Sequence, residues 1–148
     1  MIVQKNEFLE KSNETLGKIV DMLAELPVIQ IKDLQPEQTA LVIVDMINGF
    51  VREGALASNR AEKAIPAIVR LSKKCDERNI KKLAFADSHT NASPEFGAYP
   101  EHCLAGSSES EVVDELKEIG GYKLIPKNST NGFHEEEFRK WLKENHQI

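Results

Sequence analysis

The chain has 148 residues, of which 41% are hydrophobic, 29% are charged and 6% are aromatic. This composition suits one folded domain and excludes disordered, collagen-like and coiled-coil chains. The formal net charge is −5, and the basic residues form no block beyond two lysine pairs, so we expect no nucleic-acid partner. The apolar runs are far shorter than the roughly 18 residues of a membrane helix, and the first ten residues do not resemble a signal peptide. We therefore expect no membrane partner and, with only two cysteines, a reducing, cytoplasmic location.

The N-terminal part of the chain is predicted to form an amphipathic helix over residues 3–26, because apolar residues recur there at helical spacing. Pro27 ends this helix, and residues 28–39 form a polar connector. We accordingly divide the chain into a helix with its connector, residues 1–37, and a domain over residues 38–148. The apolar residues of the helix are Phe8, Leu9, Leu16, Ile19, Val20, Leu23 and Leu26.

Three short apolar runs in the second part predict β-strands over residues 40–45, 82–87 and 122–126. The first run is rich in β-branched residues, which is typical of strands buried on both faces of a parallel sheet. Each strand is followed by a predicted helix, over residues 59–78, 108–119 and 133–145. This alternation predicts an α/β fold with a doubly wound, Rossmann-like parallel sheet and flanking helices. Sheets of this kind bind ligands at the carboxyl ends of their strands.

Polar residues stand at the ends of all three predicted strands, namely Asp45, Asp87 and Lys127. In a parallel sheet these ends share one edge, so the three side chains are expected to converge. The alternative is that each residue merely begins a loop. Finding all three together weakens this alternative.

The loop after the second strand contains a second pattern, Asp87-x-His89, followed by Glu95 and His102. Carboxylate and imidazole ligands suit Zn²⁺, Mn²⁺ or Fe²⁺. Residues two apart in extended backbone point to the same face, so Asp87 and His89 can reach one ion, with His102 and Glu95 as further ligands. The alternative is a set of surface polar residues. In the same loop Phe96 and Tyr99 either form the wall of a pocket or pack the loop down.

The two cysteines are weak candidates for catalysis. Cys75 lies on the apolar face of the predicted helix 59–78 and is expected to be a small core residue. Cys103 is adjacent to His102, but neighbouring side chains usually point apart, so this histidine would be a poor base for it.

These motifs, taken in order, resemble the isochorismatase-like cysteine hydrolases, and within them the nicotinamidases. Residues 42–50 resemble the first strand of the family with its catalytic aspartate, although Ile47 stands where glutamine is common. Residues 87–89 resemble the Asp-x-His metal pair, and residues 93–106 resemble the stretch with the remaining ligands. Residues 125–133 contain the matching catalytic lysine, and the whole resemblance spans about residues 38–145.

The resemblance implies hydrolysis of nicotinamide to nicotinate and ammonia through a cysteine thioester. Asp45 would move the proton between the thiol and the leaving amine, and Lys127 would keep this aspartate ionised. Backbone N–H groups beside the cysteine would form an oxyanion hole. A divalent metal, zinc or else manganese or iron, would orient the pyridine ring. Its implied ligands are Asp87, His89, Glu95 and His102, and the implied pocket residues are Phe50, Phe96 and Tyr99.

The family places its nucleophilic cysteine after a fourth strand, and neither Cys75 nor Cys103 matches that position. We therefore expect the chain to be the N-terminal part of a longer domain, with three of about six strands, and to be inactive alone. Strand 41–44 would then be an exposed apolar edge, which favours a homo-oligomer or a complementing C-terminal fragment as partner.

Three alternatives remain from the sequence. One is a non-catalytic, metal-binding pseudoenzyme or subunit of the same fold. Another is a metal-free hydrolase of the isochorismatase or carbamoyl-hydrolase branch. The third is a phosphoacceptor signalling domain, which is disfavoured because no acidic pair follows the first strand.

Overall fold

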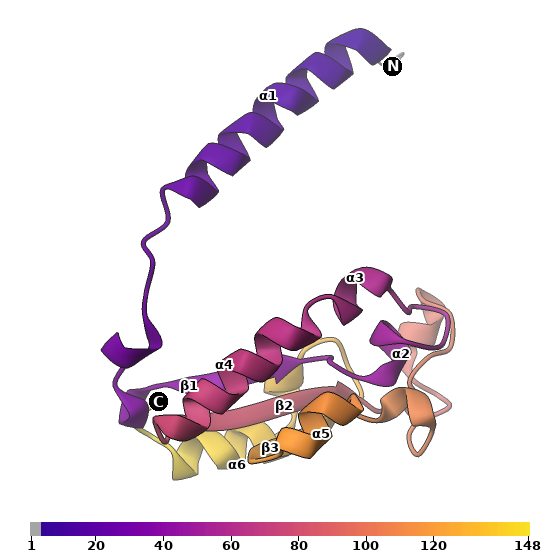
Figure 1. Cartoon of the computed structure of the whole chain (residues 1–148). Coiled ribbons are helices and arrows are strands. Elements are labelled where there is room, and N and C mark those ends of the chain that lie inside the picture. The colour runs from indigo at the N-terminus through magenta and orange to yellow at the C-terminus, as the bar shows by residue number, and fades with distance from the viewer. Residues whose placement is uncertain (1–3) are drawn as a thin grey trace. The chain divides into compact units, whose positions relative to one another are not determined.

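The computed structural model describes residues 4–148 and separates the chain into two compact units. The first unit ends at Gln30, and the second runs from Ile31 to Ile148 (Figure 1). The domain boundary expected after residue 37 stays a prediction.

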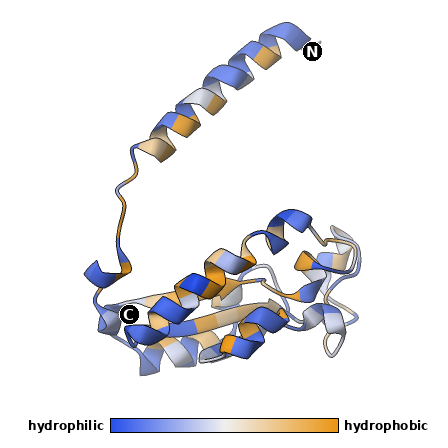
Figure 2. Cartoon of the chain, viewed as in Figure 1, coloured by the Kyte–Doolittle hydropathy of each residue, from blue (hydrophilic) through white to orange (hydrophobic). Residues whose placement is uncertain are grey.

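The first unit consists of helix α1 (Lys5–Ala24), which is shorter at both ends than the predicted helix. Residue 3, where the prediction begins, lies outside the described residues. Ion pairs join Glu7 to Lys11 and Glu14 to Lys18 along the helix. Its apolar side chains are exposed, and charged and apolar residues alternate along the ribbon (Figure 2). None of the described helices is long and apolar enough to cross a membrane.

The second unit contains a parallel sheet of three strands in the order β1 (Ala40–Val44), β2 (Lys81–Asp87) and β3 (Tyr122–Lys127). The observed strands agree within one residue with the predicted ones, and the predicted α/β class is confirmed. The register pairs Asp87 with Lys127 at the carboxyl edge, next to the end of β1. The sheet therefore brings the polar strand ends together.

The helix between β1 and β2 is broken, contrary to the prediction of one helix over residues 59–78. It forms a short α3 (Asn59–Glu62) and a longer α4 (Ile65–Glu77). Pro66 causes the break, because proline is accepted in the first turn of α4 but cannot continue a helix from α3. A further short helix, α2 (Asn48–Val51), lies between β1 and α3, where no helix was predicted.

The helix expected over residues 108–119 is also interrupted. A single 3₁₀ turn (Ser108–Ser110) precedes α5 (Asp114–Ile119), because Val112 pairs with Ile47 in an isolated antiparallel bridge. The last predicted helix begins with a 3₁₀ turn (Gly132–His134) and continues as α6 (Glu136–Glu144). The remaining short 3₁₀ turns are Ile31–Asp33, Pro36–Gln38 and Pro94–Gly97.

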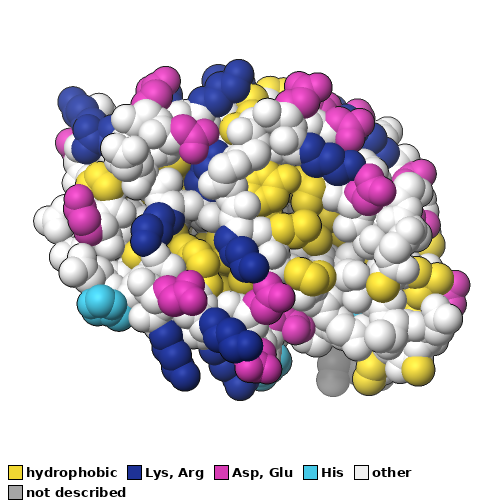
Figure 3. Space-filling model, turned by 90° about the horizontal axis from the view of Figure 1, so that it is seen from below, with side chains coloured by type: hydrophobic (Ala, Val, Ile, Leu, Met, Phe, Trp, Pro, Cys, Tyr) yellow, Lys and Arg dark blue, Asp and Glu magenta, His cyan; other side chains and the backbone are white. Residues whose placement is uncertain are grey.

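Two apolar clusters cover opposite faces of the sheet. One contains Ile43 and Leu116 and packs α4 and α5 on one face, and the other contains Phe85 and Phe138 and packs α6 on the other face (Figure 1). Val42 and Val44 of the edge strand β1 are 42% and 54% exposed. An apolar area surrounded by charged side chains is visible on one face of the molecule (Figure 3).

Candidate functional site

The carboxyl edge of the sheet holds a buried lysine between two aspartates. Lys127 is only 2% exposed, and its Nζ lies 3.1 Å from Oδ1 of Asp45 and donates a hydrogen bond to Oδ1 of Asp87. Burial alone would lower the pKa of Lys127, but the hydrogen bond and charges of the two aspartates outweigh it and raise the pKa. The lysine is therefore held as a cation between two carboxylates.

Asp45 occupies an unusual backbone position directly after β1. Its φ is +55°, in the left-handed region that costs free energy for most residues. Its N–H donates to the carbonyl of Phe85 at 3.0 Å, which holds the turn to β2. Burial, together with the charge of Asp87, raises the pKa of Asp45 despite the nearby lysine. A carboxyl with a raised pKa in a cavity is suited to taking up and releasing a proton.

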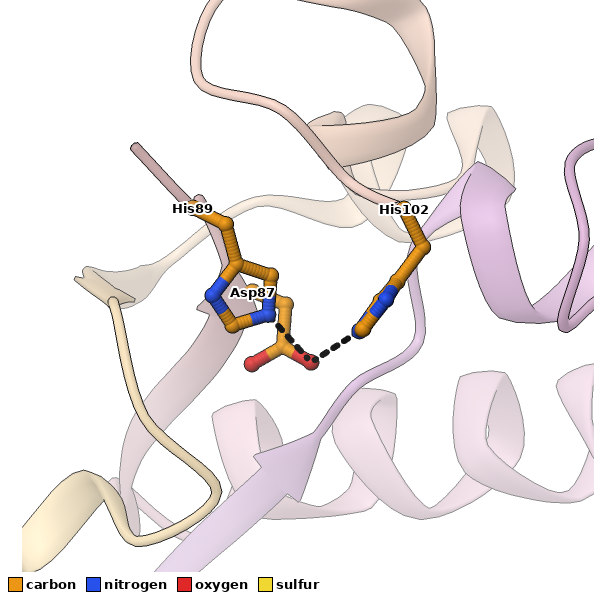
Figure 4. A group of neighbouring side chains, drawn as sticks. All are labelled: Asp87, His89 and His102. Carbon is orange, nitrogen blue, oxygen red and sulfur yellow. Dashed lines mark ion pairs between the residues drawn. The ribbon is translucent and has the colours of Figure 1, made fainter. Parts of the chain in front are cut away.

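Asp87 also meets two histidines on the side away from Lys127. Asp87, His89 and His102 are buried, and each offers a ligand atom within 4.8 Å of the others (Figure 4). Oδ2 of Asp87 lies 3.5 Å from Nε2 of His89 and 3.9 Å from Nε2 of His102. Among the described residues, Nε2 of His89 has no hydrogen-bond partner although it is buried. This group therefore has the character of a metal site.

The neighbours of Nδ1 in the two imidazoles indicate which nitrogen of each ring carries the proton. Nδ1 of His102 lies 2.7 Å from the carbonyl oxygen of Pro100, which can only accept a hydrogen bond. Nδ1 of His89 lies 3.4 Å from Oδ1 of Asn128 and 3.3 Å from Oγ of Ser93. With protons on Nδ1, both rings present an Nε2 lone pair toward Asp87, as neutral metal-binding imidazoles do. The residues present thus fit a divalent ion with two nitrogen ligands and one oxygen ligand.

Glu95 lies near Asp87, His89 and His102, but it is not one of the three residues whose ligand atoms lie within 4.8 Å of one another. Its Oε2 is 3.7 Å from Nε2 of His89. Its Oε1 is buried without a hydrogen-bond partner among the described residues. A fourth ligand role for Glu95 stays a prediction, and the unpartnered oxygen favours it.

The aromatic residues that the sequence singled out take two different places. Phe50 and Tyr99 line a cavity of about 150 Å³ together with Asp45 and Lys127. Phe96 instead packs edge-on against His89 and His102, with ring centroids 5.5 and 5.7 Å apart. The full lining of the cavity is Asp45, Phe50, Leu56, Asp87, Glu95, Tyr99, His102, Lys127 and Thr130.

Neither cysteine is placed to attack a ligand in this cavity. Cys103 is fully buried, and burial with the charges of Asp87, Glu109 and Asp45 raises the pKa of its thiol to about 12. Cys75 is buried on α4, and burial also raises the pKa of its thiol. A thiol must ionise to be a nucleophile, so both cysteines are in unsuitable surroundings.

Several contributors to the site were missed from the sequence. Asn128 and Ser93 contact His89, the Pro100 carbonyl contacts His102, and Leu56 and Thr130 line the cavity. Asn128 directly follows Lys127, so its position at the strand end was a usable signal. The other contacts depend on how the loop folds back, which no local pattern shows.

Comparison with known proteins gives relatives for the second unit. Residues 39–147 match the model of the isochorismatase domain. Nicotinamidase 1 of Arabidopsis thaliana is 36% identical over 130 residues, covering 81% of this chain and 51% of the relative. A nicotinamidase of Acinetobacter baylyi is 28% identical over 122 residues, covering 72% of this chain and 55% of the relative. The chain thus spans about half the length of the curated relatives it matches.

Solved structures give the same assignment. N-carbamoylsarcosine amidase from Thermoplasma acidophilum superposes with a TM-score of 0.68 at 28% identity, covering 74% of this chain and 62% of that one. Pyrazinamidase of Pyrococcus horikoshii, solved in complex with zinc, superposes with a TM-score of 0.63 at 26% identity. The match covers 74% of this chain and 65% of the pyrazinamidase. The fold, the cluster at the strand ends and the matched family model lead to one conclusion: the chain belongs to the isochorismatase family of hydrolases.

Proposed function

We propose that this chain supplies the metal site and the acid–base pair of a nicotinamidase-like amidohydrolase. The reaction would convert nicotinamide and water to nicotinate and ammonia. The observation that carries the proposal is the double use of Asp87. One of its oxygens contacts Lys127, and the other faces the two imidazoles. Asp45 and Lys127 therefore line one cavity together with three of the proposed metal ligands, Asp87, Glu95 and His102.

The proposed metal ligands are Asp87, His89 and His102, with Glu95 as a fourth. Zinc is the preferred ion because two imidazoles and carboxylate oxygens match its usual ligands. A bound ion would supply an electron-pair acceptor for a ring nitrogen of the substrate.

Asp45 is the proposed proton carrier. Its Oδ1 faces the ammonium of Lys127, which favours the ionised form, while burial favours the protonated form. These opposing effects suit a group that accepts a proton from a thiol and returns it to leaving ammonia. Lys127 would keep the carboxylate in place throughout.

The cavity favours a small, flat amide. Its volume of about 150 Å³ is well below the roughly 300–1,000 Å³ typical of pockets for drug-sized ligands. Phe50 and Tyr99 would contact the faces or edges of an aromatic ring.

The attacking thiol is proposed to come from outside these 148 residues, because the two cysteines present are buried with raised pKa values. The exposed edge strand β1 is then the proposed contact for a second copy or a complementing C-terminal fragment.

Two measurements on the chain test this proposal. Titration calorimetry should detect nicotinamide binding in the presence of zinc, and His89→Ala should remove it. An ammonia assay with the chain alone should detect no turnover. Absence of zinc-dependent nicotinamide binding would refute the assignment of the cavity. Clear turnover by the chain alone would refute the need for an external thiol.

A second candidate is favoured by the likeness to N-carbamoylsarcosine amidase. In that case the cavity would accept an N-carbamoyl amino acid and need no metal. The same calorimetry with N-carbamoylsarcosine in a chelating buffer distinguishes the two. A third candidate, a metal-binding subunit without catalysis, predicts bound zinc and a stable oligomer but no nicotinamide binding.

A further inference from the structure

The backbone next to His102 is held in a costly conformation. Cys103 has a φ of +47°, which lies in the left-handed region that is unfavourable for a non-glycine residue. Its carbonyl accepts a hydrogen bond from the N–H of His89 at 2.9 Å. The same turn therefore links the main chains of both proposed imidazole ligands. Whatever fixes Cys103 also fixes the distance between His89 and His102.

One side chain holds this turn from the other side. Oε2 of Glu109 accepts a hydrogen bond from the N–H of Cys103 at 2.8 Å. Hydrogen bonds to an ionised acceptor are roughly twice as strong as neutral ones. This bond is well placed to offset the unfavourable φ of Cys103.

Two glycines make room for Glu109. A Cβ on Gly54 would lie 2.6 Å from the carboxylate of Glu109, and a Cβ on Gly49 would lie 3.1 Å from Cβ of Glu109. A Cβ on Gly49 would also lie 2.4 Å from Sγ of Cys103. Glu109 thus fits closely against residues 49–54, the segment that carries the cavity residue Phe50.

The surrounding backbone strengthens this connection. The side chain of Asn48 donates to the carbonyl of Ser108 at 3.1 Å, and the N–H of Asn48 donates to the carbonyl of Glu111 at 2.9 Å. The segment around Glu109 is therefore anchored to α2 on both sides. Glu109 does not line the cavity itself, so any effect on the site passes through its neighbours.

We propose that Glu109 is a positioning residue for the metal site. Its carboxylate fixes the backbone of Cys103 and thereby sets the imidazoles of His89 and His102 at the separation that one ion requires. By the same contact it holds the Phe50 segment against the cavity. This inference rests on the proposed metal site but not on any particular substrate.

Zinc affinity of the chain, measured by competition with a chromophoric chelator, tests the proposal. Glu109→Ala should bind zinc about tenfold more weakly, at the lower end of the roughly 10- to 100-fold loss for a direct hydrogen-bond partner of a metal ligand, because Glu109 acts through Cys103. Glu109→Gln keeps an acceptor for the Cys103 N–H and should recover most of the affinity. Glu109→Asp keeps the charge but is one methylene shorter, so it should be weakened like the alanine variant. This variant also decides the question if Glu109→Ala does not fold.

Glu111→Ala is the matched control, because Glu111 lies two residues away and, within residues 4–148, its side chain makes only an exposed ion pair with Lys117. Its zinc affinity should equal that of the unchanged chain. The visible spectrum of bound Co²⁺ gives a second measure, since it should change for Glu109→Ala and not for the control.

The other possible results of the binding measurements either overturn or support the role of Glu109. Unchanged zinc affinity in Glu109→Ala and Glu109→Asp would overturn the proposal, as would an equal loss in the Glu111→Ala control. A chain that binds zinc no better than its His102→Ala variant would overturn both the metal site and the role of Glu109. Zinc binding that depends on Glu109, without nicotinamide binding, would support this inference and refute the proposed substrate.

Discussion

Asn128 offers a sensitive test of how the site prepares His89. Its Oδ1 accepts a hydrogen bond from the N–H of Thr90 at 3.0 Å, so an oxygen rather than an amide nitrogen faces the ring. The same oxygen lies 3.4 Å from Nδ1 of His89. This arrangement favours a proton on Nδ1 and leaves the Nε2 lone pair for a metal.

The size of the effect follows from the contacts of His89. Loss of such an outer partner typically lowers metal affinity about 10- to 100-fold. In Asn128→Ala the hydroxyl of Ser93 still lies 3.3 Å from Nδ1. We therefore expect a loss of about tenfold, or about 1.4 kcal/mol, in the single variant. Combining it with Ser93→Ala removes both partners and should approach a loss of about 100-fold, or about 2.7 kcal/mol.

Zinc competition titrations on the folded variants measure these losses. Asn128→Asp is the matched control, because it keeps an oxygen acceptor at the same place and should bind zinc at least as tightly as the unchanged chain. A double variant that binds zinc with unchanged affinity would refute the assignment of the tautomer and, with it, the role of Nε2.

Three further predictions concern stability. In Gly132→Ala the new Cβ would lie 2.5 Å from ring carbons of Phe85, so we expect the free energy of unfolding in urea to fall by about 1–3 kcal/mol; an unchanged urea midpoint would contradict this packing. In Asp76→Ala the buried Lys82 loses the carboxylate 2.7 Å from its Nζ, and we expect a loss of about 1–3 kcal/mol by the same measurement. Equal stability of this variant would show that the remaining partners of the lysine suffice. Burial and the charge of Asp87 raise the folded-state pKa of Asp45 above its ordinary value of 3.8. The folded chain therefore binds the proton of the Asp45 carboxyl more tightly than the unfolded chain does, and it loses stability as the pH rises from the unfolded-state pKa to the folded-state pKa. The metal-free Asp45→Asn variant should therefore gain stability relative to the unchanged chain as the pH rises above about 4, and a difference in stability that does not change with pH would refute the assignment.

The strands were predictable from the sequence because each is a short apolar run. The expected burial on both faces holds along most of β2 but not for β1, where Val42 and Val44 are exposed. The helices were less predictable because their breaks have tertiary causes. Val112 leaves the helical path in order to pair with Ile47, which lies far away in the sequence. Pro66 was visible in the sequence, but its neighbours continue the apolar pattern of one helix, so periodicity concealed the break.

The site, like the fold, could be predicted from the sequence only in part. The convergence of Asp45, Asp87 and Lys127 follows from parallel topology, because all three stand at strand ends. The place of Phe96 does not, since its ring could face either the cavity or the imidazoles from the same loop position. The loop geometry that decides between them depends on hydrogen bonds such as that from the N–H of His89 to the carbonyl of Cys103.

The charges around the cavity give an independent reason to expect a divalent ion. Asp45, Asp87, Glu95 and Lys127 all line it, and when all are ionised two negative charges remain without a balancing cation. Imidazoles that present Nε2 lone pairs are neutral and cannot supply the balance. Uncompensated charge in a buried site is costly, and burial together with the charge of Asp87 raises the pKa of Asp45. An ion of charge +2 beside Asp87 would remove this imbalance, so the strand-end aspartate that pairs with Lys127 also supports the proposed metal.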